Sequence, residues 1–522
     1  MTYSENADAM LDALSRTPNF ARVAGDVLDA ETLNAILGEA AKVAESAVAP
    51  VGPISDRVGA RFADGRVTLP SEYGPAWDAL AEGGWLGLEH EERFGGMGMP
   101  LSVFAAVNPL FERACAPFMM CAGGSRSAAL LLSAWADAEL RDDWVPALVA
   151  GERCATICIS EPEAGSDVGR IRTRAEKGPD GWQVSGQKIW ISFGDHDLRD
   201  RIGHCMLART GDAPGTRGLS LFFVERGPGV ICERIEEKMG LHGSPTCALR
   251  FEDAPAVLIG EEGRGLPQLF TMIRHMRLSV ATQGLGIALG SYDVAREHAE
   301  SRRQGGDPKA PAVPIIQHAD VQRQLMAMKS RIDLFRLALV EAACAADLSG
   351  DDPDMARLCS WLLPLIKNFG AEMGFDCAHA AIQVLGGAGF TKDYPVEQYL
   401  RDARVFTIYE GTTGMQGQDF LLRQTLAEDG AAVKVFLKIA AAECAEHTGA
   451  LAVVERFGAF AEEVTDADKA RLPGMADAFL RAGWVAVQAW LSVRIAETGE
   501  AAFFRATAAA ELELRIAAAR AA

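Results

Sequence analysis

The chain has 522 residues, of which 49% are hydrophobic and 23% are charged, and its formal net charge is −20. This balance is typical of a folded globular protein and excludes a disordered chain, a collagen-like repeat and a small disulfide-rich protein. The acidic total argues against a polyanion such as DNA as a general partner, because phosphate contacts need clustered Lys and Arg.

The cysteines and the N-terminal residues bear on the compartment. Eleven cysteines are spread without a Cys-x-x-Cys pair, and no asparagine begins an Asn-x-Ser/Thr sequon, so we expect a reducing, cytoplasmic location. Residues 1–26 carry acids among their apolar residues and lack the basic start and apolar block of a signal peptide. We find no uninterrupted apolar run of about 18 residues and therefore expect no membrane span.

At roughly 150 residues per domain the length suggests about three domains, and four segments of different pattern follow one another along the chain. Apolar residues first recur at helical spacing, then short β-rich runs alternate with turn signals such as Pro179-Asp180-Gly181, and helical spacing then returns. The expected fold class is α+β, with a middle antiparallel β-barrel or sandwich. The predicted domains are an N-terminal all-helical domain (1–152), a middle β domain (153–264), a C-terminal helical bundle (265–428) and an appended Ala-rich helical subdomain (429–522).

The common signatures of metal and nucleotide chemistry are absent from the sequence. No His-Glu-x-x-His occurs, and the nine histidines do not group with Cys or carboxylates at ligand spacing, so we predict no metal site. There is neither a Gly-x-Ser-x-Gly elbow nor a Walker loop. Gly284, Gly286 and Gly290 have the wrong interval for a dinucleotide fingerprint and lie in a helical pattern, which predicts helix-packing sites.

Three segments are poorly explained by ordinary packing. The run SEPEAGSD at 160–167 follows a buried-looking strand; its backbone N–H groups can face a flat or anionic ligand, and a plain β-turn explains it as well. In GQKIWIS at 186–192, Trp190 can pack on a ring system or in the core. Glycines of LGGAGF at 385–390 and of the YEGTT run permit close backbone approach, and Glu410 is either a base or a helix-end cap.

These motifs, with KMG at 238–240 and SPT at 244–246, resemble the acyl-CoA dehydrogenase family from about residue 84 to 422. The resemblance implies FAD-dependent α,β-desaturation of an acyl-CoA thioester, in which an α proton and a β hydride leave the substrate. Glu410 is then the catalytic base, and the hydride goes to flavin N5. Burial among apolar groups should raise the pKa of Glu410, because desolvation penalises its charged form.

The resemblance also implies further contacts residue by residue, and a site that a second subunit completes. The implied cofactor-binding residues are Ile159, Ser160, Gly165, Ser166, Trp190, Ser192, Arg302, Gln383, Gly386, Gly387 and Thr412. The implied substrate-binding residues are Ser166, Arg277, Tyr409 and Gly411, with a structural ion pair as the alternative for Arg277. Because Arg302, Gln383, Gly386 and Gly387 would complete the site of a second copy, we expect a homodimer or a tetramer.

Departures from the family pattern bear on the substrate. Arg274 replaces an Asp, Gly414 replaces a flavin-contacting Gln, and Met276 stands where some members carry their base. The RRQG run at 302–305 and the extra C-terminal helices resemble an enlarged bacterial branch, which includes 3-methylmercaptopropionyl-CoA dehydrogenases and broad-specificity fatty acyl-CoA enzymes. We therefore expect one of these substrates, a role in fatty acid metabolism or β-oxidation, and electron-transferring flavoprotein as the electron acceptor.

Two alternative functions share parts of this pattern. An acyl-CoA oxidase has the same fold and half-reaction but lets oxygen reoxidise the flavin. A nucleic-acid-associated flavoprotein also carries added C-terminal helices, but from Thr425 onward the chain has 14 acids and 10 bases. That segment therefore has a net charge of −4 and lacks the basic face that nucleic acid requires.

Overall fold

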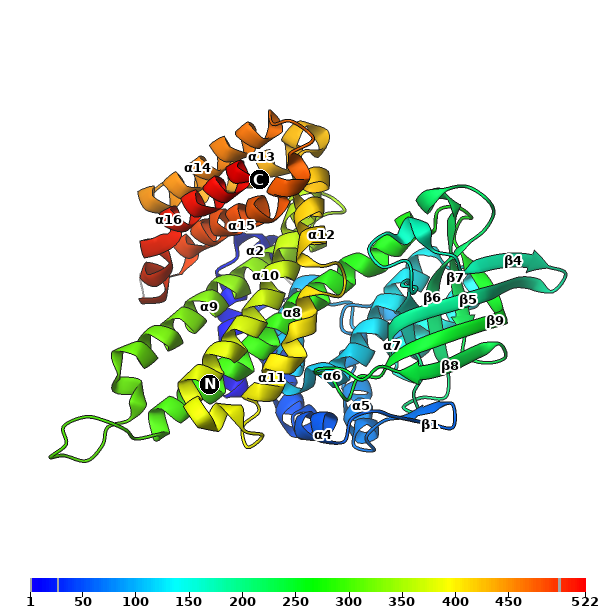
Figure 1. The fold of residues 1–522 in the computed structure, drawn as a ribbon, viewed down its shortest axis with the longest axis horizontal. Helices are drawn as coiled ribbons and strands as arrows, with labels where there is room; N and C mark the ends of the chain where they lie inside the picture. The colour runs from blue at the N-terminus through cyan, green and yellow to red at the C-terminus, as the bar shows by residue number, and fades with distance from the viewer. Residues whose placement is uncertain (1, 26–27, 496–498) are drawn as a thin grey trace. The chain divides into compact units, whose positions relative to one another are not determined.

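The computed structural model describes residues 2–25, 28–495 and 499–522, and the chain divides into two compact units (Figure 1). We call one the helical unit; it comprises Met1–Lys42, Pro100–Arg113 and Arg277–Ala522. The other, the barrel unit, comprises Val43–Met99 and Ala114–Met276. Two long helices, α6 (Leu101–Trp135) and α8 (Gly265–Ser301), contribute residues to both units.

The barrel unit contains a seven-stranded sheet that closes on itself. Its strands are β3 (Cys154–Cys158), β4 (Arg174–Gly178), β5 (Gly181–Ser192), β6 (Ile202–Arg209), β7 (Leu219–Glu225), β8 (Val230–Ile235) and β9 (Thr246–Ile259). They follow the order β3-β6-β4-β5-β9-β7; β7 also pairs with β6, and β8 pairs with β9. The predicted barrel is thus confirmed.

The sheet is mixed rather than purely antiparallel, and this corrects the sequence prediction. The strand β3 runs parallel to β6, with Cys154 opposite Ile202, and β4 touches β6 in parallel at its first residue. Parallel neighbours need a long connection. The chain between β3 and β6 supplies one, since residues 159–201 lie between these strands and include β4 and β5.

The helices of the barrel unit include α4 (Val51–Arg57), α5 (Tyr73–Glu82) and α7 (Ala138–Val149). Of these, α7 shares an apolar core with the sheet. Trp144 of α7 packs edge-on against Phe223 of β7, with ring centroids 4.6 Å apart. Both rings belong to a buried cluster that also includes Leu207 and Leu221 of the barrel strands. The strands β6 and β7 are buried almost throughout, so their sequences are continuous apolar runs instead of alternating ones.

A small hairpin lies within the segment that the sequence pattern assigned to helices. Its strands are β1 (Arg61–Ala63) and β2 (Arg66–Thr68), and they pair antiparallel. The turn residues Asp64 and Gly65 have φ of 52° and 76°. Asp-Gly is the preferred pair for such a two-residue turn, so the dipeptide was the local signal for this hairpin.

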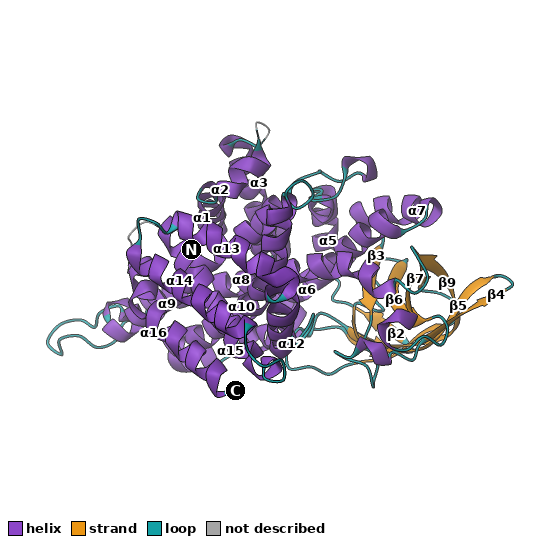
Figure 2. Cartoon of the chain, turned by 90° about the horizontal axis from the view of Figure 1, so that it is seen from above, coloured by secondary structure: helices purple, strands orange, loops and turns teal. Residues whose placement is uncertain are grey.

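The helical unit packs its long helices side by side (Figures 1 and 2). Its helices are α1 (Tyr3–Ser15), α2 (Pro18–Ala24), α3 (Ala30–Val43), α9 (Ala319–Asp347), α10 (Pro353–Leu385), α11 (Val396–Ala403), α12 (Thr413–Gln418), α13 (Ala431–Glu443), α14 (Thr448–Thr465), α15 (Leu472–Leu491) and α16 (Gly499–Ala521). The bounds of α10 follow from its sequence. Asp352 caps its N-terminus, Pro353 occupies the first turn, and Gly386 ends it with φ 62°.

The C-terminal helices α13 to α16, orange to red in Figure 1, share a core with α10. Trp361 of α10 stacks on Phe436 of α13 at 4.3 Å, and Phe369 stacks on Trp484 of α15 at 4.9 Å. Stacked aromatic pairs add to the stabilisation from burial. The appended helices therefore complete the bundle's own core.

The glycines of α8 confirm the predicted helix packing. A Cβ on Gly284 would lie 1.9 Å from the carbonyl oxygen of Gly370 on α10, and Gly374 meets the backbone of Gly284 in turn. Only glycine permits such a close approach of two helix backbones.

Among the described residues, one helix is long and apolar enough to cross a membrane. This helix is α6, and 78% of its most apolar window is buried inside the protein. A mostly buried apolar helix is a core element, and α6 accordingly contributes Leu131 and Leu132 to the core of the barrel unit.

Candidate functional site

The loop after β3 is fixed by a buried ion pair in the barrel unit. The Lys188 ammonium donates to a Glu161 carboxylate oxygen at 2.8 Å and to the Ile159 carbonyl at 3.0 Å. The same carboxylate accepts from the backbone N–H groups of Arg172 (2.7 Å) and Thr173 (3.1 Å). Burial opposes the charge on Glu161, but Lys188 and these donors lower the pKa of its carboxyl. The pair therefore stays ionised and holds the loop in one conformation.

Trp190 projects from the sheet at a bulge. Its backbone has φ 63°, and it lies where the pairing of β5 with β9 shifts register between Lys188 and Ile191. The side chain is 59% exposed, so the core-packing interpretation is wrong. A bulge redirects a side chain, and a non-glycine residue in the left-handed region stores strain. The barrel unit thus presents an exposed aromatic face.

Predicted cofactor residues of the barrel unit meet on adjacent backbone segments. The Ile189 N–H donates to the Ser160 carbonyl at 2.9 Å, and the Thr156 hydroxyl donates to the Ser192 carbonyl at 2.7 Å. The end of β3, which leads to Ile159 and Ser160, therefore lies beside the Trp190 end of β5.

The adjoining loop combines a turn with open space. Glu161 and Ala164 exchange backbone hydrogen bonds of 3.0 and 3.1 Å, which confirms the β-turn interpretation of this segment. Gly165 and Ser166 are exposed, and a Cβ on Gly165 would meet no atom within 4 Å. A β-turn in this loop does not prevent a ligand from approaching Gly165. The predicted ligand contact of the loop therefore stays a prediction.

In the helical unit, Glu410 lies in a short loop between a 3-10 turn (Arg404–Thr407) and α12. Its φ is 51°, and that of Gly411 is 92°. The Gln416 side-chain amide donates to the Glu410 carbonyl at 2.9 Å and to the Gly411 carbonyl at 3.3 Å. The buried Lys367 ammonium donates to the Gly411 carbonyl at 2.7 Å. These bonds offset the strain of the left-handed conformation at Glu410, whereas Gly411 adopts its positive φ without strain.

The cap of α12 is Thr412, not Glu410. The Thr412 hydroxyl accepts from the Met415 N–H at 3.4 Å, and the Thr412 backbone is extended as an N-cap requires. The helix-cap interpretation of Glu410 is therefore wrong, and its carboxylate is not used for capping.

Two cations act on the Glu410 carboxyl. Burial raises the pKa of Glu410, and the charges of Lys367 and Arg277 partly oppose that rise. Burial also lowers the pKa of Lys367 to about 7, with Glu410 opposing the shift. The predicted direction for Glu410 and its cause, desolvation, agree with this geometry.

Arg277 forms the structural ion pair that was its alternative interpretation. Its guanidinium donates to a buried carboxylate oxygen of Asp419 at 2.6 Å. Tyr409 donates its hydroxyl to the Gln283 side chain and stacks on Phe406. The predicted substrate contacts of Arg277, Tyr409 and Gly411 stay predictions.

The four residues assigned to a second subunit's site are exposed. Arg302 follows α8, Gln383 lies in the last turn of α10, and Gly386 and Gly387 follow it. A Cβ on either glycine would meet no atom within 4 Å. The backbone there is open to close approach by a ligand or another molecule.

Sequence reasoning missed two lysines that support this geometry. Lys188 and Lys367 are both fully buried, although Lys is almost never buried without a partner. Lys367 stands in an apolar stretch at 361–371, and Lys188 directly precedes the apolar run at 189–191. These positions were the available signals in the sequence.

Helices followed by a closed barrel and a helical bundle form the fold of a class of flavin-dependent oxidoreductases. Three family models match the chain in that order: the acyl-CoA dehydrogenase N-terminal domain (residues 31–152), middle domain (156–254) and C-terminal domain (263–426). The chain belongs to the acyl-CoA dehydrogenase family.

Relatives of known activity support this assignment. The chain is 35% identical over 478 residues to 3-methylmercaptopropionyl-CoA dehydrogenase of Ruegeria pomeroyi, covering 87% of this chain and 81% of the relative. It is 36% identical over 442 residues to the broad-specificity linear acyl-CoA dehydrogenase FadE5 of Mycobacterium tuberculosis, covering 78% and 72%. The chain is therefore an acyl-CoA dehydrogenase, an FAD-dependent oxidoreductase of acyl-CoA metabolism.

Solved structures match the same fold. Butyryl-CoA dehydrogenase of Megasphaera elsdenii is 26% identical with a TM-score of 0.66, covering 74% of this chain and 96% of that one. A chain from the electron transferring flavoprotein study of Acidaminococcus fermentans is 27% identical with a TM-score of 0.66, covering 74% and 97%. ACDH-11 of Caenorhabditis elegans, in complex with C11-CoA, covers 97% of this chain and 90% of its own at 20% identity, with a TM-score of 0.79. This last likeness shows that the fold includes the C-terminal helices.

The residues present fit the FAD that members of this family bind. The exposed Trp190 ring offers a flat face for a ring system, and the adjacent loop supplies the Ser160 and Ser166 hydroxyls. The open space above Gly165 lets a ligand approach the backbone.

Proposed function

We propose that this chain introduces an α,β double bond into an acyl-CoA thioester with Glu410 as the base. The observation that carries the proposal is a carboxyl group that, among the described residues, neither caps a helix nor forms an ion pair, and whose pKa is raised by burial. A base is most effective when its pKa lies near the working pH, and desolvation moves Glu410 in that direction. Bound FAD supplies the acceptor for the β hydride.

Residues of the chain have three tasks in this reaction. A Glu410 carboxylate oxygen removes the α proton, and its backbone N–H stabilises negative charge on the thioester oxygen. Lys367 and Gln416 hold the Glu410 loop through the carbonyls of Glu410 and Gly411. The loop containing Ser160 and Ser166 and the Trp190 face bind and orient the cofactor.

We propose 3-methylmercaptopropionyl-CoA or a linear fatty acyl-CoA as the substrate, which the two relatives near 35% identity support. The test is anaerobic bleaching of the flavin by a graded acyl-CoA panel that includes both classes. We expect one class of acyl-CoA to bleach the flavin with a larger rate constant than the other acyl-CoAs of the panel. Absence of bleaching by every acyl-CoA would overturn the proposed function, and stoichiometric hydrogen peroxide in air would make the protein an oxidase.

A homodimer and electron-transferring flavoprotein complete the proposal. The exposed positions of Arg302, Gln383, Gly386 and Gly387 support a second copy at this surface, because they leave charged and backbone groups available to it. The structural match to a chain from the Acidaminococcus flavoprotein study supports the electron acceptor.

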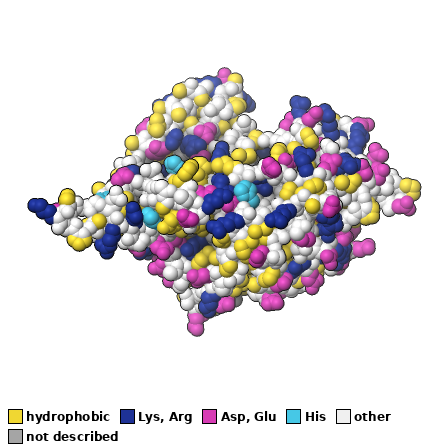
Figure 3. Space-filling model, turned by 60° about the horizontal axis from the view of Figure 1, so that its bottom comes forward, with side chains coloured by type: hydrophobic (Ala, Val, Ile, Leu, Met, Phe, Trp, Pro, Cys, Tyr) yellow, Lys and Arg dark blue, Asp and Glu magenta, His cyan; other side chains and the backbone are white. Residues whose placement is uncertain are grey.

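No specific observation favours nucleic acid. Figure 3 shows, on the face that it presents, Lys and Arg side chains interspersed with Asp and Glu side chains. Binding along a phosphate backbone needs positive charge gathered on one face. The net charge of −20 likewise argues against binding to a phosphate backbone.

The Lys367→Met variant is expected to shift the pH dependence of flavin bleaching upward. Lys367 lowers the pKa of Glu410, so its removal lets the pKa of Glu410 rise further. Only the ionised carboxylate accepts a proton, and the rate therefore increases with pH through this pKa. The rising limb of the pH profile, measured by anaerobic stopped flow, should move to higher pH.

Lys434→Met is the matched control for this change. Lys434 is an exposed lysine of the same unit that donates to the Asp429 carbonyl. Its loss should leave the rising limb in place. An unchanged limb in Lys367→Met would show that Lys367 has no electrostatic effect on the base.

A further inference from the structure

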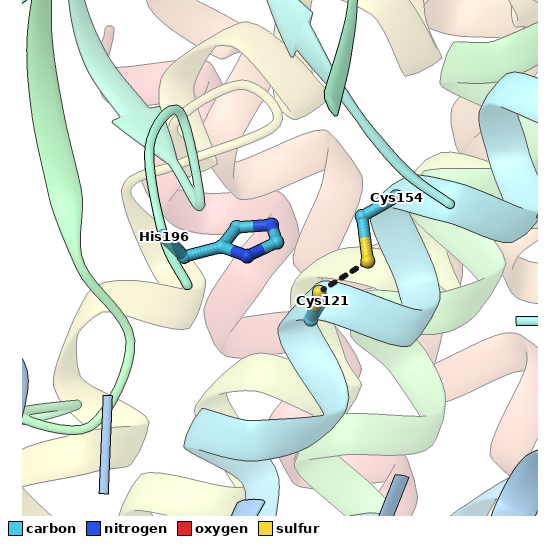
Figure 4. Close-up of side chains that lie close together, drawn as sticks. All are labelled: Cys121, Cys154 and His196. Atoms are coloured by element: carbon cyan, nitrogen blue, oxygen red, sulfur yellow. Dashed lines mark hydrogen bonds between the residues drawn. The ribbon is translucent and has the colours of Figure 1, made fainter. Parts of the chain in front are cut away.

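Two cysteines and a histidine of the barrel unit lie close together in space although they are far apart in the sequence. Cys121 comes from α6, Cys154 is the first residue of β3, and His196 lies in the loop after β5, with its ring turned toward the two sulfurs (Figure 4). The two Sγ atoms are 3.7 Å apart. One ligand atom from each residue lies within 4.8 Å of the others.

The three side chains are buried, and one of them has an unused polar atom. Exposure is 2% for Cys121, 1% for Cys154 and 0% for His196. The His196 Nδ1 accepts from the Leu198 N–H at 3.2 Å, but its Nε2 is buried without a hydrogen-bond partner among the described residues. Buried polar atoms are normally satisfied, so an orphaned ring nitrogen beside two sulfurs needs an explanation.

We propose that Cys121, Cys154 and His196 bind one soft metal ion through two thiolates and the His196 Nε2. Thiolate ligands select Cu(I) and Zn²⁺ among common ions, and both also accept imidazole. The sulfur separation suits two thiolates on one ion, because ligands about 2.3 Å from a tetrahedral centre lie roughly 3.8 Å apart. The imidazole nitrogen needs only a small movement to complete the set.

Charge and protonation around the cluster are compatible with a metal ion. Both thiols must lose their protons to bind an ion. Ion binding therefore releases two thiol protons and moves the His196 proton from Nε2 to Nδ1. That move gives up the Leu198 hydrogen bond, a small loss beside three metal–ligand bonds.

An open cleft is lined by residues that follow His196 in the chain. Leu198, Arg199, Asp200 and Arg201 line this cleft, whose volume is about 490 Å³. Zn²⁺ prefers four ligands and would need a water as the fourth, whereas Cu(I) is satisfied by the three protein ligands.

The test is anaerobic titration of the reduced, metal-stripped holoenzyme with Cu(I) and, separately, with Zn²⁺. We expect one equivalent of at least one ion to remain after gel filtration, with thiolate-to-metal charge-transfer absorption for Cu(I). Cys154→Ala and Cys121→Ala should weaken binding by more than about tenfold, since even supporting residues of metal sites contribute that much.

Cys158→Ala is the matched control, because Cys158 is a buried cysteine of the same strand outside the cluster. It should bind the ion as the wild type does. If the cysteine variants fail to fold, two measurements replace them. One is metal binding by His196→Gln, and the other is X-ray absorption of the loaded wild type, which should show two sulfur ligands and one nitrogen ligand. Retention of no ion by the wild type, equal loss in the control, or a Cys121–Cys154 disulfide by mass spectrometry would each overturn the site.

Discussion

The Glu410→Gln variant is expected to retain its yellow FAD spectrum and to lose bleaching by acyl-CoA. Glutamine has nearly the shape of glutamate, so the loop bonds from Lys367 and Gln416 to the backbone carbonyls are kept. The amide cannot accept the α proton. General bases contribute about 10² to 10⁴ in rate, so the rate constant for anaerobic bleaching should fall by at least about a hundredfold.

The pH profile separates loss of the base from a general loss of structure. Burial raises the pKa of Glu410, so the carboxyl is protonated and inactive below a pKa higher than that of an ordinary glutamate. The wild-type rate should therefore rise with pH through this value, and residual bleaching in Glu410→Gln should lack that limb.

Glu428→Gln supplies the comparison for the same chemical change. Glu428 is exposed in the same unit and pairs with Arg357 at 3.2 Å. Surface pairs of this kind contribute little, so the variant should bleach at the wild-type rate. Bleaching by Glu410→Gln within a few fold of wild type would remove Glu410 from the mechanism.

The fold was largely predictable because two local periodicities distinguish its parts. Helical spacing marks α9, which spans Ala319–Asp347 inside the segment 265–428 that the sequence predicted to be a helical bundle. Strand runs separated by turn signals mark the barrel. The parallel pairing of β3 with β6 was not predictable in the same way, because Cys154 and Ile202 come together through a long connection that leaves no local pattern.

The site was predictable only where a motif names its residues. The backbone conformation of Trp190 depends on a register shift between two strands, so its exposure could not be inferred from an apolar run. The candidate metal ligands Cys121, Cys154 and His196 are separated by more than 30 residues each, and ligand spacing in the sequence therefore misses them. Such sites depend on tertiary structure rather than on short motifs.

The Lys188→Met variant is expected to lower the free energy of unfolding by about 3 to 5 kcal/mol, the usual cost of removing one partner of a buried pair. Methionine fills a similar volume but leaves the Glu161 carboxylate, which is 6% exposed, without its cation. The Ile159 carbonyl also loses its donor, so FAD should bind more weakly. Urea unfolding and FAD retention after gel filtration measure the two effects.

A second substitution decides whether charge causes this loss. Glu161→Gln in the Lys188→Met background removes the uncompensated charge, and an oxygen remains to accept from the Arg172 or Thr173 N–H. The double variant should recover much of the stability. The loss in free energy of unfolding caused by Lys188→Met should also shrink as the pH falls. In the wild type the pKa of Glu161 is lowered, so protonation of Glu161 removes the stabilising charge of the pair. In the variant, protonation of Glu161 removes an uncompensated charge and is stabilising. Equal destabilisation of the single and double variants at every pH would show that packing, not the ion pair, holds the loop.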